Sequence, residues 1–365
     1  QHEEPRQDPP VLKSLRLDFK RDREIVRLSG PIVGGMVSQT LVNLVDTAMV
    51  GRLSQDALAA VGLGSVTTWL SVSLLLGLGS ATQAVVARRI GEERPMEAGR
   101  ALNNALLMGS TCGLVMAVLI LLCTPAIFSV LGSSPEVARL GEDYLTMRTI
   151  GFPFVVLNFA FRGFYHGIGD TRTYLKAITL TNVLNAALDA VLIFGLLGFP
   201  RLGAQGAGLA TALGLAGGTV YYVLVAAPRT RIRARFGALA RGTISRDACR
   251  RLVAIMVPNG LQNLGTALGF VVFYWMMAQV DTTAVAINNV LINVGSFFHL
   301  PALGMGLAAA TLVGQSLGRG EPGEAEAWGW ETLRLSTYVL AVAGLALVLF
   351  PEPVLRVFTT EQDVI

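Results

Sequence analysis

Residues 31–50 read PIVGGMVSQTLVNLVDTAMV, a stretch in which Asp46 is the only charged side chain. An α-helix needs about 20 mostly apolar residues to cross the ~30 Å hydrocarbon core of a bilayer. Eight more apolar runs follow, and none shows the strict alternation that is typical of barrel strands. The nine predicted spans are 31–50, 57–87, 101–123, 144–163, 174–198, 205–227, 252–280, 284–313 and 333–350.

The composition of the whole chain agrees with this prediction. Of the 365 residues, 52% are hydrophobic and only 15% are charged, and the mean hydropathy is +0.55. A soluble domain carries about 25% charged residues, so this chain has too little charge to cover a water-exposed surface. The sequence therefore predicts an all-α, polytopic transmembrane helical bundle. It excludes disordered, coiled-coil and disulfide-rich secreted classes.

The basic residues are distributed unevenly over the predicted loops. Of the 29 Lys and Arg residues, 24 lie in the N-terminal arm and in the loops that follow the second, fourth, sixth and eighth spans. Cytoplasmic loops carry an excess of Lys and Arg, so we expect a multi-pass protein of the inner or plasma membrane with a cytoplasmic N-terminus. The same rule explains the net charge of +4 without nucleic acid as a partner. The five remaining cations are assigned to loops on the other side, at Arg52, Arg139, Arg148, Arg201 and Arg356.

Several chemistries find no support in the residue pattern. The sequence contains no Ser/His/Asp arrangement, no Walker sequence and no metal-ligand spacing, so we predict no enzyme, no cofactor and no metal site. An odd number of cysteines indicates reduced thiols. Arg162 and His166, at the cytoplasmic end of the fourth span, are expected to contact lipid headgroups or to set the topology.

The chain matches itself at an offset of 227 residues. The informative part of the match is a run in which rare residue types coincide: Gly77 falls on Gly304, Gly79 on Gly306, Gly91 on Gly318, Pro95 on Pro322 and Glu97 on Glu324. We infer a duplication into two pseudo-symmetric six-helix lobes, a plan in which a transport site lies between the halves. The second copy would then lack its last three helices, because Ile365 corresponds to Ala138. The predicted regions are a cytoplasmic basic arm (1–28), an N-terminal lobe (29–228), a cytoplasmic linker (229–251) and a partial C-terminal lobe of three helices (252–365).

Two acidic residues, Asp46 and Asp189, lie deep within predicted spans. A carboxylate inside a membrane costs a few kcal/mol to insert, so such a residue is by default a functional candidate. Each aspartate shares a helix face with amides, because residues at i, i+3 or i+4, and i+7 align. The first stripe is Gln39, Asn43 and Asp46, and the second is Asn182, Asn185 and Asp189. Asn158 in the fourth span and Thr211 in the sixth are expected to face the same cavity.

A carboxylic acid in apolar surroundings holds its proton more tightly than one in water. Such an acid can load a proton from one side of the membrane and release it when the site becomes hydrated. The same oxygen atoms could instead bind Na⁺, or the acids could simply hold helices together. Polar residues of the second half could line a substrate cavity or join helices by hydrogen bonds. They are Asn259, Gln262, Asn263, Asn288, Asn289 and Asn293.

From about Pro31 to its end, the sequence resembles the multidrug and toxic compound extrusion (MATE) transporters. The resemblance depends on the order and spacing of short motifs. They are Asn43-Leu-Val-Asp46-Thr47, Leu58-Ala-Ala-Val61, Arg162-Gly163 with Gly169-Asp-Thr-Arg172, Asn185-x-x-x-Asp189, and Gly203-x-x-Gly206-Ala-x-x-Ala210-Thr211.

The resemblance implies alternating access and export against a cation gradient. In the branch that resembles DinF, first-lobe aspartates with nearby Asn and Thr residues form the proton-coupling site, which corresponds here to Asp46, Asn158, Asn185, Asp189 and Thr211. The first-helix proline, Pro31 here, is associated with bending of that helix. The other main branch has a glutamate where this chain has Thr266, which favours the DinF-like branch.

The sequence therefore predicts a monomeric, cation-coupled antiporter that exports organic drugs or metabolites, with H⁺ as the expected coupling ion and Na⁺ as the alternative. A lipid-linked oligosaccharide flippase of the same superfamily is a second hypothesis. A flippase of this kind would need Arg or Lys residues deep in the cavity to hold a pyrophosphate. No Arg or Lys is predicted in the middle of a span. A membrane channel or receptor is a third hypothesis, which the repeat and the buried acids disfavour.

Overall fold

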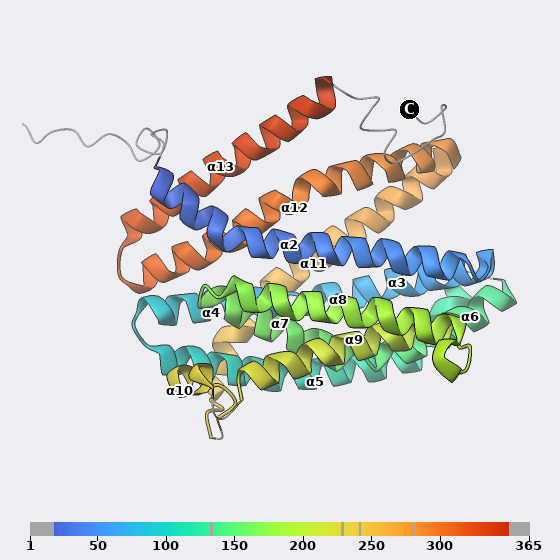
Figure 1. The fold of residues 1–365 in the computed structure, drawn as a ribbon, viewed down its shortest axis with the longest axis horizontal. Coiled ribbons are helices and arrows are strands. Elements are labelled where there is room, and N and C mark those ends of the chain that lie inside the picture. Colours follow the sequence, from blue (N-terminus) through green and yellow to red (C-terminus); the bar gives the residue numbers. More distant parts are fainter. Residues whose placement is uncertain (1–17, 132–133, 228–229, 241, 281, 350–365) are drawn as a thin grey trace, which may run out of the picture.

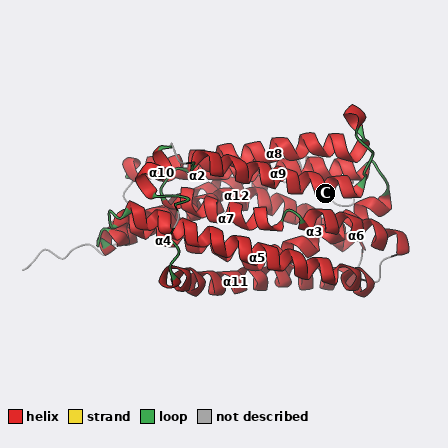
Figure 2. Cartoon of the chain, turned by 90° about the horizontal axis from the view of Figure 1, so that it is seen from below, coloured by secondary structure: helices red, strands yellow, loops and turns green. Residues whose placement is uncertain are grey.

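The fold is a bundle of long helices, in which α11, α12 and α13 are inclined to the helices that precede them (Figure 1). The computed structural model describes residues 18–131, 134–227, 230–240, 242–280 and 282–349. Within these ranges the chain forms helices and connecting loops and no strand, as Figure 2 shows. The all-α prediction is therefore confirmed.

The helices, in chain order, have the following bounds. They are α2 (Phe19–Gly51), α3 (Gln55–Leu75), α4 (Gly77–Gly91), α5 (Pro95–Val130), α6 (Pro135–Thr149), α7 (Phe152–Gly167), α8 (Thr171–Phe194), α9 (Ala204–Val225), α10 (Arg231–Phe236), α11 (Arg246–Val280), α12 (Thr282–Gly318) and α13 (Pro322–Leu349), with a 3₁₀ turn η1 (Leu196–Gly198). Each of the nine predicted spans coincides over most of its length with one helix or with two consecutive helices. By length and composition, six stretches of the described residues can cross a membrane, or seven if the bent pair α6 and α7 counts as one span.

Two of the differences between the predicted spans and the observed helices have local reasons. The predicted span 144–163 is a pair of helices, α6 and α7, that meet at an angle of 47°. Pro153 lies in the first turn of α7, and a proline cannot continue a helix because it lacks the N–H and its ring clashes with an earlier carbonyl. The predicted span 174–198 ends four residues early, at Phe194, because Gly195 has a φ of 74°. Glycine adopts this left-handed conformation readily and therefore often ends a helix.

Side-chain caps fix where several helices begin. The Ser54 hydroxyl accepts a hydrogen bond of 3.0 Å from the Ala57 amide at the start of α3. Asp170 Oδ1 accepts one of 3.2 Å from the Thr173 amide at the start of α8. A Ser or Asp side chain in this position satisfies an amide that has no partner inside the helix. These caps mark the points at which α3 and α8 begin.

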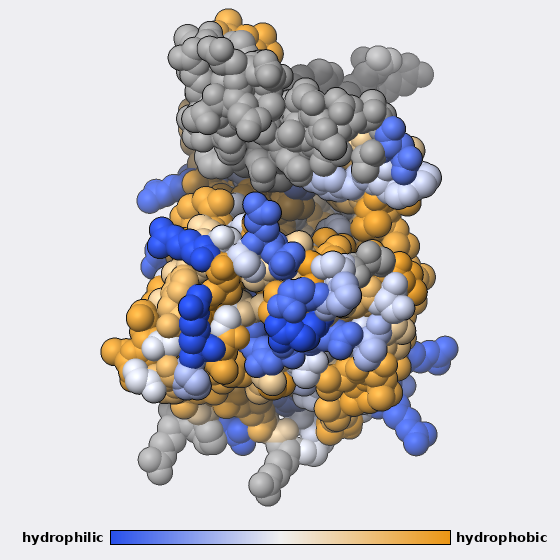
Figure 3. All heavy atoms as spheres, turned by 90° about the vertical axis from the view of Figure 1, so that its right-hand side faces the viewer, coloured by the Kyte–Doolittle hydropathy of each residue, from blue (hydrophilic) through white to orange (hydrophobic). Residues whose placement is uncertain are grey.

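The alternation of the helices separates the loops into two groups. The start of α2 and the connections α4–α5, α7–α8, α9–α11 and α12–α13 lie at one end of the bundle, which we call the basic end (Figure 1). Helices α2, α5, α8 and α11 run to the opposite end, whose face carries hydrophilic side chains near its middle and apolar ones on its flanks (Figure 3). The breaks between α3 and α4 and between α6 and α7 lie between the two ends. The loops that the sequence assigns to the cytoplasm therefore share one end. Which side of a membrane this end faces stays a prediction.

Helices α2 and α4 connect the helices before residue 228 with those after it. Helix α2 contacts α8 on one side and α12 on the other, and α4 contacts α7, α11 and α12 (Figure 1). Helix boundaries also follow the internal repeat, since α4 and α12 end at the matched Gly91 and Gly318 and α5 and α13 begin at the matched Pro95 and Pro322. The division into lobes at residues 228 and 252 stays a prediction.

Stacked aromatic rings hold α7 against α9. Tyr222 of α9 stacks on Phe161 with ring centroids 5.1 Å apart and on Tyr165 with centroids 5.3 Å apart. All three side chains are buried, and each such pair contributes about 0.5–1.5 kcal/mol beyond the area it buries. These stacked rings pack α7 directly against α9.

Candidate functional site

The first polar stripe runs along the face of α2 that approaches α8. Gln39 Nε2 donates a hydrogen bond of 3.1 Å to Asn43 Oδ1, one turn further along the helix. Asp46 follows on the same face and is partly buried. Pro31 lies inside α2, and the helix continues through it from Phe19 to Gly51. Bending at Pro31 stays a prediction.

The second polar stripe, on α8, is almost completely buried. Asn182, Asn185 and Asp189 are 2%, 5% and 0% exposed. Asn182 Nδ2 donates to the Ser38 hydroxyl of α2 at 2.9 Å. Asn185 Nδ2 donates to Asp189 Oδ2 at 2.9 Å, and it lies 3.5 Å from the Thr211 hydroxyl of α9. The stripe therefore links α8 to both of its neighbours.

The two aspartates come together between α2 and α8. Their carboxyl groups are close enough to interact directly. The Oδ1 atom of each is buried and has no hydrogen-bond partner among the described residues. Two ionised carboxylates in contact repel each other, so such a pair favours a shared proton or a cation between them. The tertiary structure thus joins two sequence candidates that lie far apart in the chain.

Asp46 lines a cavity of about 440 Å³, which we call the Asp46 cavity. Its wall includes Thr211 of α9, Ser65 of α3, and Tyr144 and Arg148 of α6. The hydroxyls of Ser65 and Tyr144 are 3.1 Å apart, and the Arg148 guanidinium lies 5.7 Å from the centre of the Tyr144 ring. Asp189 lies behind this wall, out of contact with solvent.

The prediction that Arg148 lies in a loop on the outer side is wrong. The bend between α6 and α7 turns the last residues of α6 inward, so Arg148 lines the same cavity as Asp46. The position of Arg148 inside the predicted span 144–163 was a signal that it is not a loop residue. Tyr144, Ser65 and Thr68 were not identified from the sequence, because single hydroxyls are common in membrane helices.

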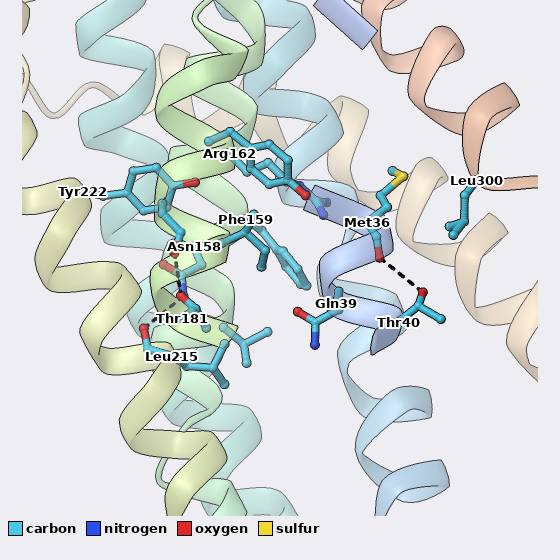
Figure 4. A pocket seen from close by; sticks show the side chains of 14 residues that line it. Met36, Gln39, Thr40, Asn158, Phe159, Arg162, Thr181, Leu215, Tyr222 and Leu300 are labelled. Atoms are coloured by element: carbon cyan, nitrogen blue, oxygen red, sulfur yellow. Dashed lines mark hydrogen bonds between the residues drawn. The ribbon is translucent and has the colours of Figure 1, made fainter. Parts of the chain in front are cut away.

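A second cavity, of about 380 Å³, adjoins the first and is called the Arg162 cavity (Figure 4). Met36 and Gln39 of α2 face Phe159 and Arg162 of α7 across it, and Leu300 of α12 lies at its edge. Among its lining residues Arg162 is the only charged one, and its guanidinium lies 4.9 Å from the centre of the Phe159 ring. The two cavities share the lining residues Gln39, Val155 and Leu215.

Arg162 and His166 do not lie where the sequence analysis expected them. Arg162 lines the cavity instead of a headgroup-facing surface. His166 is 1% exposed and packs edge-on against Tyr174, with ring centroids 4.7 Å apart. The reason is that the last turns of α7 are covered by α4 and α12. Thr311 of α12 donates a hydrogen bond of 2.9 Å to the His166 carbonyl.

The remaining candidates are placed as follows. Asn158 lines the Arg162 cavity, where its Nδ2 donates to the Leu215 carbonyl at 3.1 Å and its Oδ1 accepts from Thr219 at 3.1 Å. It is therefore tied to α9 and not to the aspartates. Gln262 is exposed and Asn263 half-buried on α11, and neither lines the Asp46 cavity or the Arg162 cavity. The side chains of Asn288, Asn289 and Asn293 lie outside the described residues.

Comparison with known proteins gives a consistent result. The MatE family model matches residues 31–191 and 258–365. The chain is 27% identical over 343 residues to the probable multidrug resistance protein NorM of Thermotoga maritima, covering 94% of this chain and 73% of that protein. It is 28% identical over 349 residues to the FAD transporter of Shewanella oneidensis, covering 94% and 75% respectively. It also resembles the solved outward-facing conformation of a multidrug resistance MATE family transporter of the MOP superfamily, with 26% identity, a TM-score of 0.84, and coverage of 97% of this chain and 77% of that one.

Proposed function

This chain belongs to the MatE family of multi-pass membrane transporters, and from this premise we propose that it is a proton-coupled antiporter that exports organic compounds by alternating access. The observation that carries the proposal is that Asp46 and Asp189 lie beside each other between α2 and α8, with the Oδ1 atom of each buried and without a hydrogen-bond partner among the described residues. A pair of buried carboxyl groups holds one proton in common, because a double negative charge in an apolar environment is costly.

Proton exchange follows from the different surroundings of the two acids. Asp46 reaches the Asp46 cavity, whereas Asp189 is fully buried and accepts a hydrogen bond from Asn185. Protons therefore enter and leave through Asp46. Arg148, in the wall of the same cavity, supplies a positive charge that stabilises the pair after the proton has left. Loss of the proton changes the net charge of the Asp46–Asp189 pair, and this change in charge couples protonation to the packing of α2 against α8.

Alternating access is supported by the contacts at the basic end. Gln83 Nε2 of α4 donates to the Leu307 carbonyl of α12 at 2.7 Å and to the Thr311 hydroxyl at 3.0 Å. Gln315 Nε2 of α12 donates to the Gly167 carbonyl of α7 at 3.0 Å. The helices before and after residue 228 are thus joined near the basic end. If that end is cytoplasmic, as its charge predicts, this conformation is closed toward the cytoplasm.

The Arg162 cavity is the proposed place for part of the substrate. Its volume of about 380 Å³ falls within the range of about 300–1,000 Å³ that is usual for small-molecule sites. Phe159, Tyr174 and Tyr222 offer aromatic surface, and Gln39 and Asn158 offer amides. Aromatic organic compounds fit this lining. A single arginine and no carboxylate specifically favour aromatic anions as a second class of substrate.

The proposal is tested by transport in proteoliposomes. A pH gradient should drive movement of a fluorescent aromatic substrate, and Asp189→Asn and Asp46→Asn should each abolish this transport while the protein still inserts. Asp56→Asn is the matched control, because Asp56 is an exposed acid in the first turn of α3.

Two outcomes would contradict the proposal in different ways. Transport that responds to a Na⁺ gradient and not to a pH gradient would show that the coupling ion is wrong. Normal transport by both Asp46→Asn and Asp189→Asn would show that the coupling site is wrong.

A further inference from the structure

A third cavity, of about 740 Å³, lies between α4, α11 and α12. It is lined by none of the residues that form the Asp46 cavity or the Arg162 cavity. Its charged lining residues are Arg88, Arg89, Glu92 and Arg251, so we call it the Arg88–Arg251 cavity. The rest of its lining consists of small and apolar residues, namely Ala84, Val85, Ala254, Ile255, Ala310, Val313, Gly314 and Leu317.

The cavity exists because α4 is held against its two neighbours at different levels. At one level, a Cβ atom added to Gly77 would lie only 2.8 Å from the Gly260 amide nitrogen of α11. At the other, a Cβ atom added to Gly91 would lie only 2.9 Å from the Gly318 Cα atom of α12. These glycines let the helix backbones touch. Between the two levels, short side chains such as Ala84 leave the space unfilled.

On α4 and α11, the charged lining residues of this cavity lie closer to the basic end than the apolar ones. Arg88 is three residues from the end of α4 at Gly91, and Arg251 lies in the second turn of α11, so both are near the basic end. The apolar lining of α11 begins at Ala254 and continues away from that end. Arg251 directly precedes Leu252, which is completely buried. Along α4 and α11 the lining therefore changes from charged at the basic end to apolar further inside, whereas α12 contributes apolar residues at both levels.

The arginines retain positive charge for a ligand. Arg89 is 16% exposed and forms ion pairs with Glu92 and with Glu97, the latter at 3.2 Å. Arg88 contacts Glu92 through its Nε at 3.2 Å, but 67% of its side chain is exposed. Arg251 is also exposed. With three arginines and one glutamate, the cavity lining has a net positive charge.

We propose that the Arg88–Arg251 cavity binds one anionic glycerophospholipid. Arg88 and Arg251 hold the phosphate, and an acyl chain occupies the apolar part between α4, α11 and α12. Basic pockets between membrane helices at the cytoplasmic side are typical places for anionic headgroups. A small soluble anion would satisfy the arginines, but it would leave the apolar walls uncovered. Only a ligand with a charged head and an apolar chain matches both parts.

The position of the cavity gives the lipid a structural effect. One wall comes from α4 and the other from α11 and α12, which lie on opposite sides of the predicted linker 229–251. A lipid bound here contacts both groups of helices and stabilises the packing seen in this structure. This inference is independent of the coupling role of the aspartates.

The test measures lipid preference in nanodiscs of phosphatidylcholine that contain a trace of spin-labelled phosphatidylglycerol. The wild-type protein should immobilise phosphatidylglycerol in preference to spin-labelled phosphatidylcholine. Arg88→Gln/Arg251→Gln should weaken this preference roughly tenfold or more, since each basic residue near an anionic surface contributes strongly to binding. Arg139→Gln/Arg201→Gln, which removes the same charge at the opposite end, should leave it unchanged.

A third variant and a competition experiment decide whether the cavity itself is the site. Ala254→Phe keeps every charge but fills the space between the helices. It should reduce the preference for phosphatidylglycerol as strongly as Arg88→Gln/Arg251→Gln does. If that double variant fails to fold, Ala254→Phe alone tests whether the cavity binds the lipid. Unchanged binding by Ala254→Phe would overturn the proposal, because the lipid would then be held by surface charge alone. Displacement by millimolar glycerol 3-phosphate would also overturn it, because the site would then bind a free phosphate. No preference in the wild type would overturn it as well.

Discussion

Asp189 and Asp46 differ in their access to water although their carboxyl groups meet. Asp189 is completely buried and has Asn185 as a hydrogen-bond donor, whereas Asp46 reaches a cavity. Because a buried charge is stable only when it is paired, we expect the pair to change its protonation as one unit. Single substitutions at either position should therefore give similar losses of coupling.

Arg162 determines whether the neighbouring cavity favours anions. Arg162→Gln should reduce export of a fluorescent aromatic anion roughly tenfold, since a hydrogen bond to a charged group contributes about 1.5–3 kcal/mol. Export of an aromatic cation should change little. The measurement is the initial transport rate over a range of substrate concentrations.

Arg172→Gln is the matched control for Arg162, because Arg172 is exposed at the basic end, at the start of α8. An equal loss for anion and cation in Arg162→Gln would mean that Arg162 supports the structure of the cavity and does not select its ligand.

At the level of helices, ion pairs join the start of α2 to α13. Arg21 contacts Glu331 and Glu324, each at 2.9 Å. Arg334 contacts Asp22 at 2.7 Å, and the two side chains are 6% and 18% exposed. Trp328 covers the Arg21 guanidinium at 5.4 Å. Helix α2 begins twelve residues before the predicted span, and these contacts give the additional turns a role.

Loss of Asp22 should therefore destabilise the protein measurably. Asp22→Ala removes a carboxylate that faces a mostly buried guanidinium, and we expect a cost of about 2 kcal/mol. This is below the roughly 3–5 kcal/mol that is typical of fully buried pairs, because Asp22 keeps some exposure. The thermal unfolding midpoint in detergent measures the effect.

Glu24→Ala serves as the comparison for Asp22→Ala. Its partner Arg27 is 67% exposed, and exposed pairs contribute about 0–1 kcal/mol. Equal midpoints for the two variants would show that the link between α2 and α13 does not stabilise the fold.

On the scale of the whole molecule, the two ends differ in the number of Lys and Arg residues in their loops. The sequence predicts that the basic end is cytoplasmic. In a protein with Cys112, Cys123 and Cys249 replaced by serine, Arg201→Cys should react with a membrane-impermeant maleimide in intact cells. Arg94→Cys, in the α4–α5 connection, should react only after the cells are permeabilised.

Labelling of Arg94→Cys in intact cells, with Arg201→Cys protected, would reverse the predicted orientation. Labelling of both positions after permeabilisation is the control for accessible thiols.

Much of the architecture could be predicted from the sequence. Helix positions, their alternation and the grouping of basic loops depend on local properties, namely an apolar length of about 20 residues and the charge of short loops. The stripes of Asn43 and Asp46, and of Asn185 and Asp189, follow from the helical period alone. Local backbone chemistry set the exceptions, since Pro153 and Gly195 changed the expected helix bounds.

The sequence by itself determined which polar residues share one face of a helix, because periodicity acts within a single helix. Only the tertiary structure decided which of them meet. Asp46 and Asp189 come from different helices, and Arg148 and Arg162 line cavities because of the bend at Pro153 and the packing of α12 on α7. Such contacts depend on distances between segments remote in the chain, and those distances are set by how all the helices pack together.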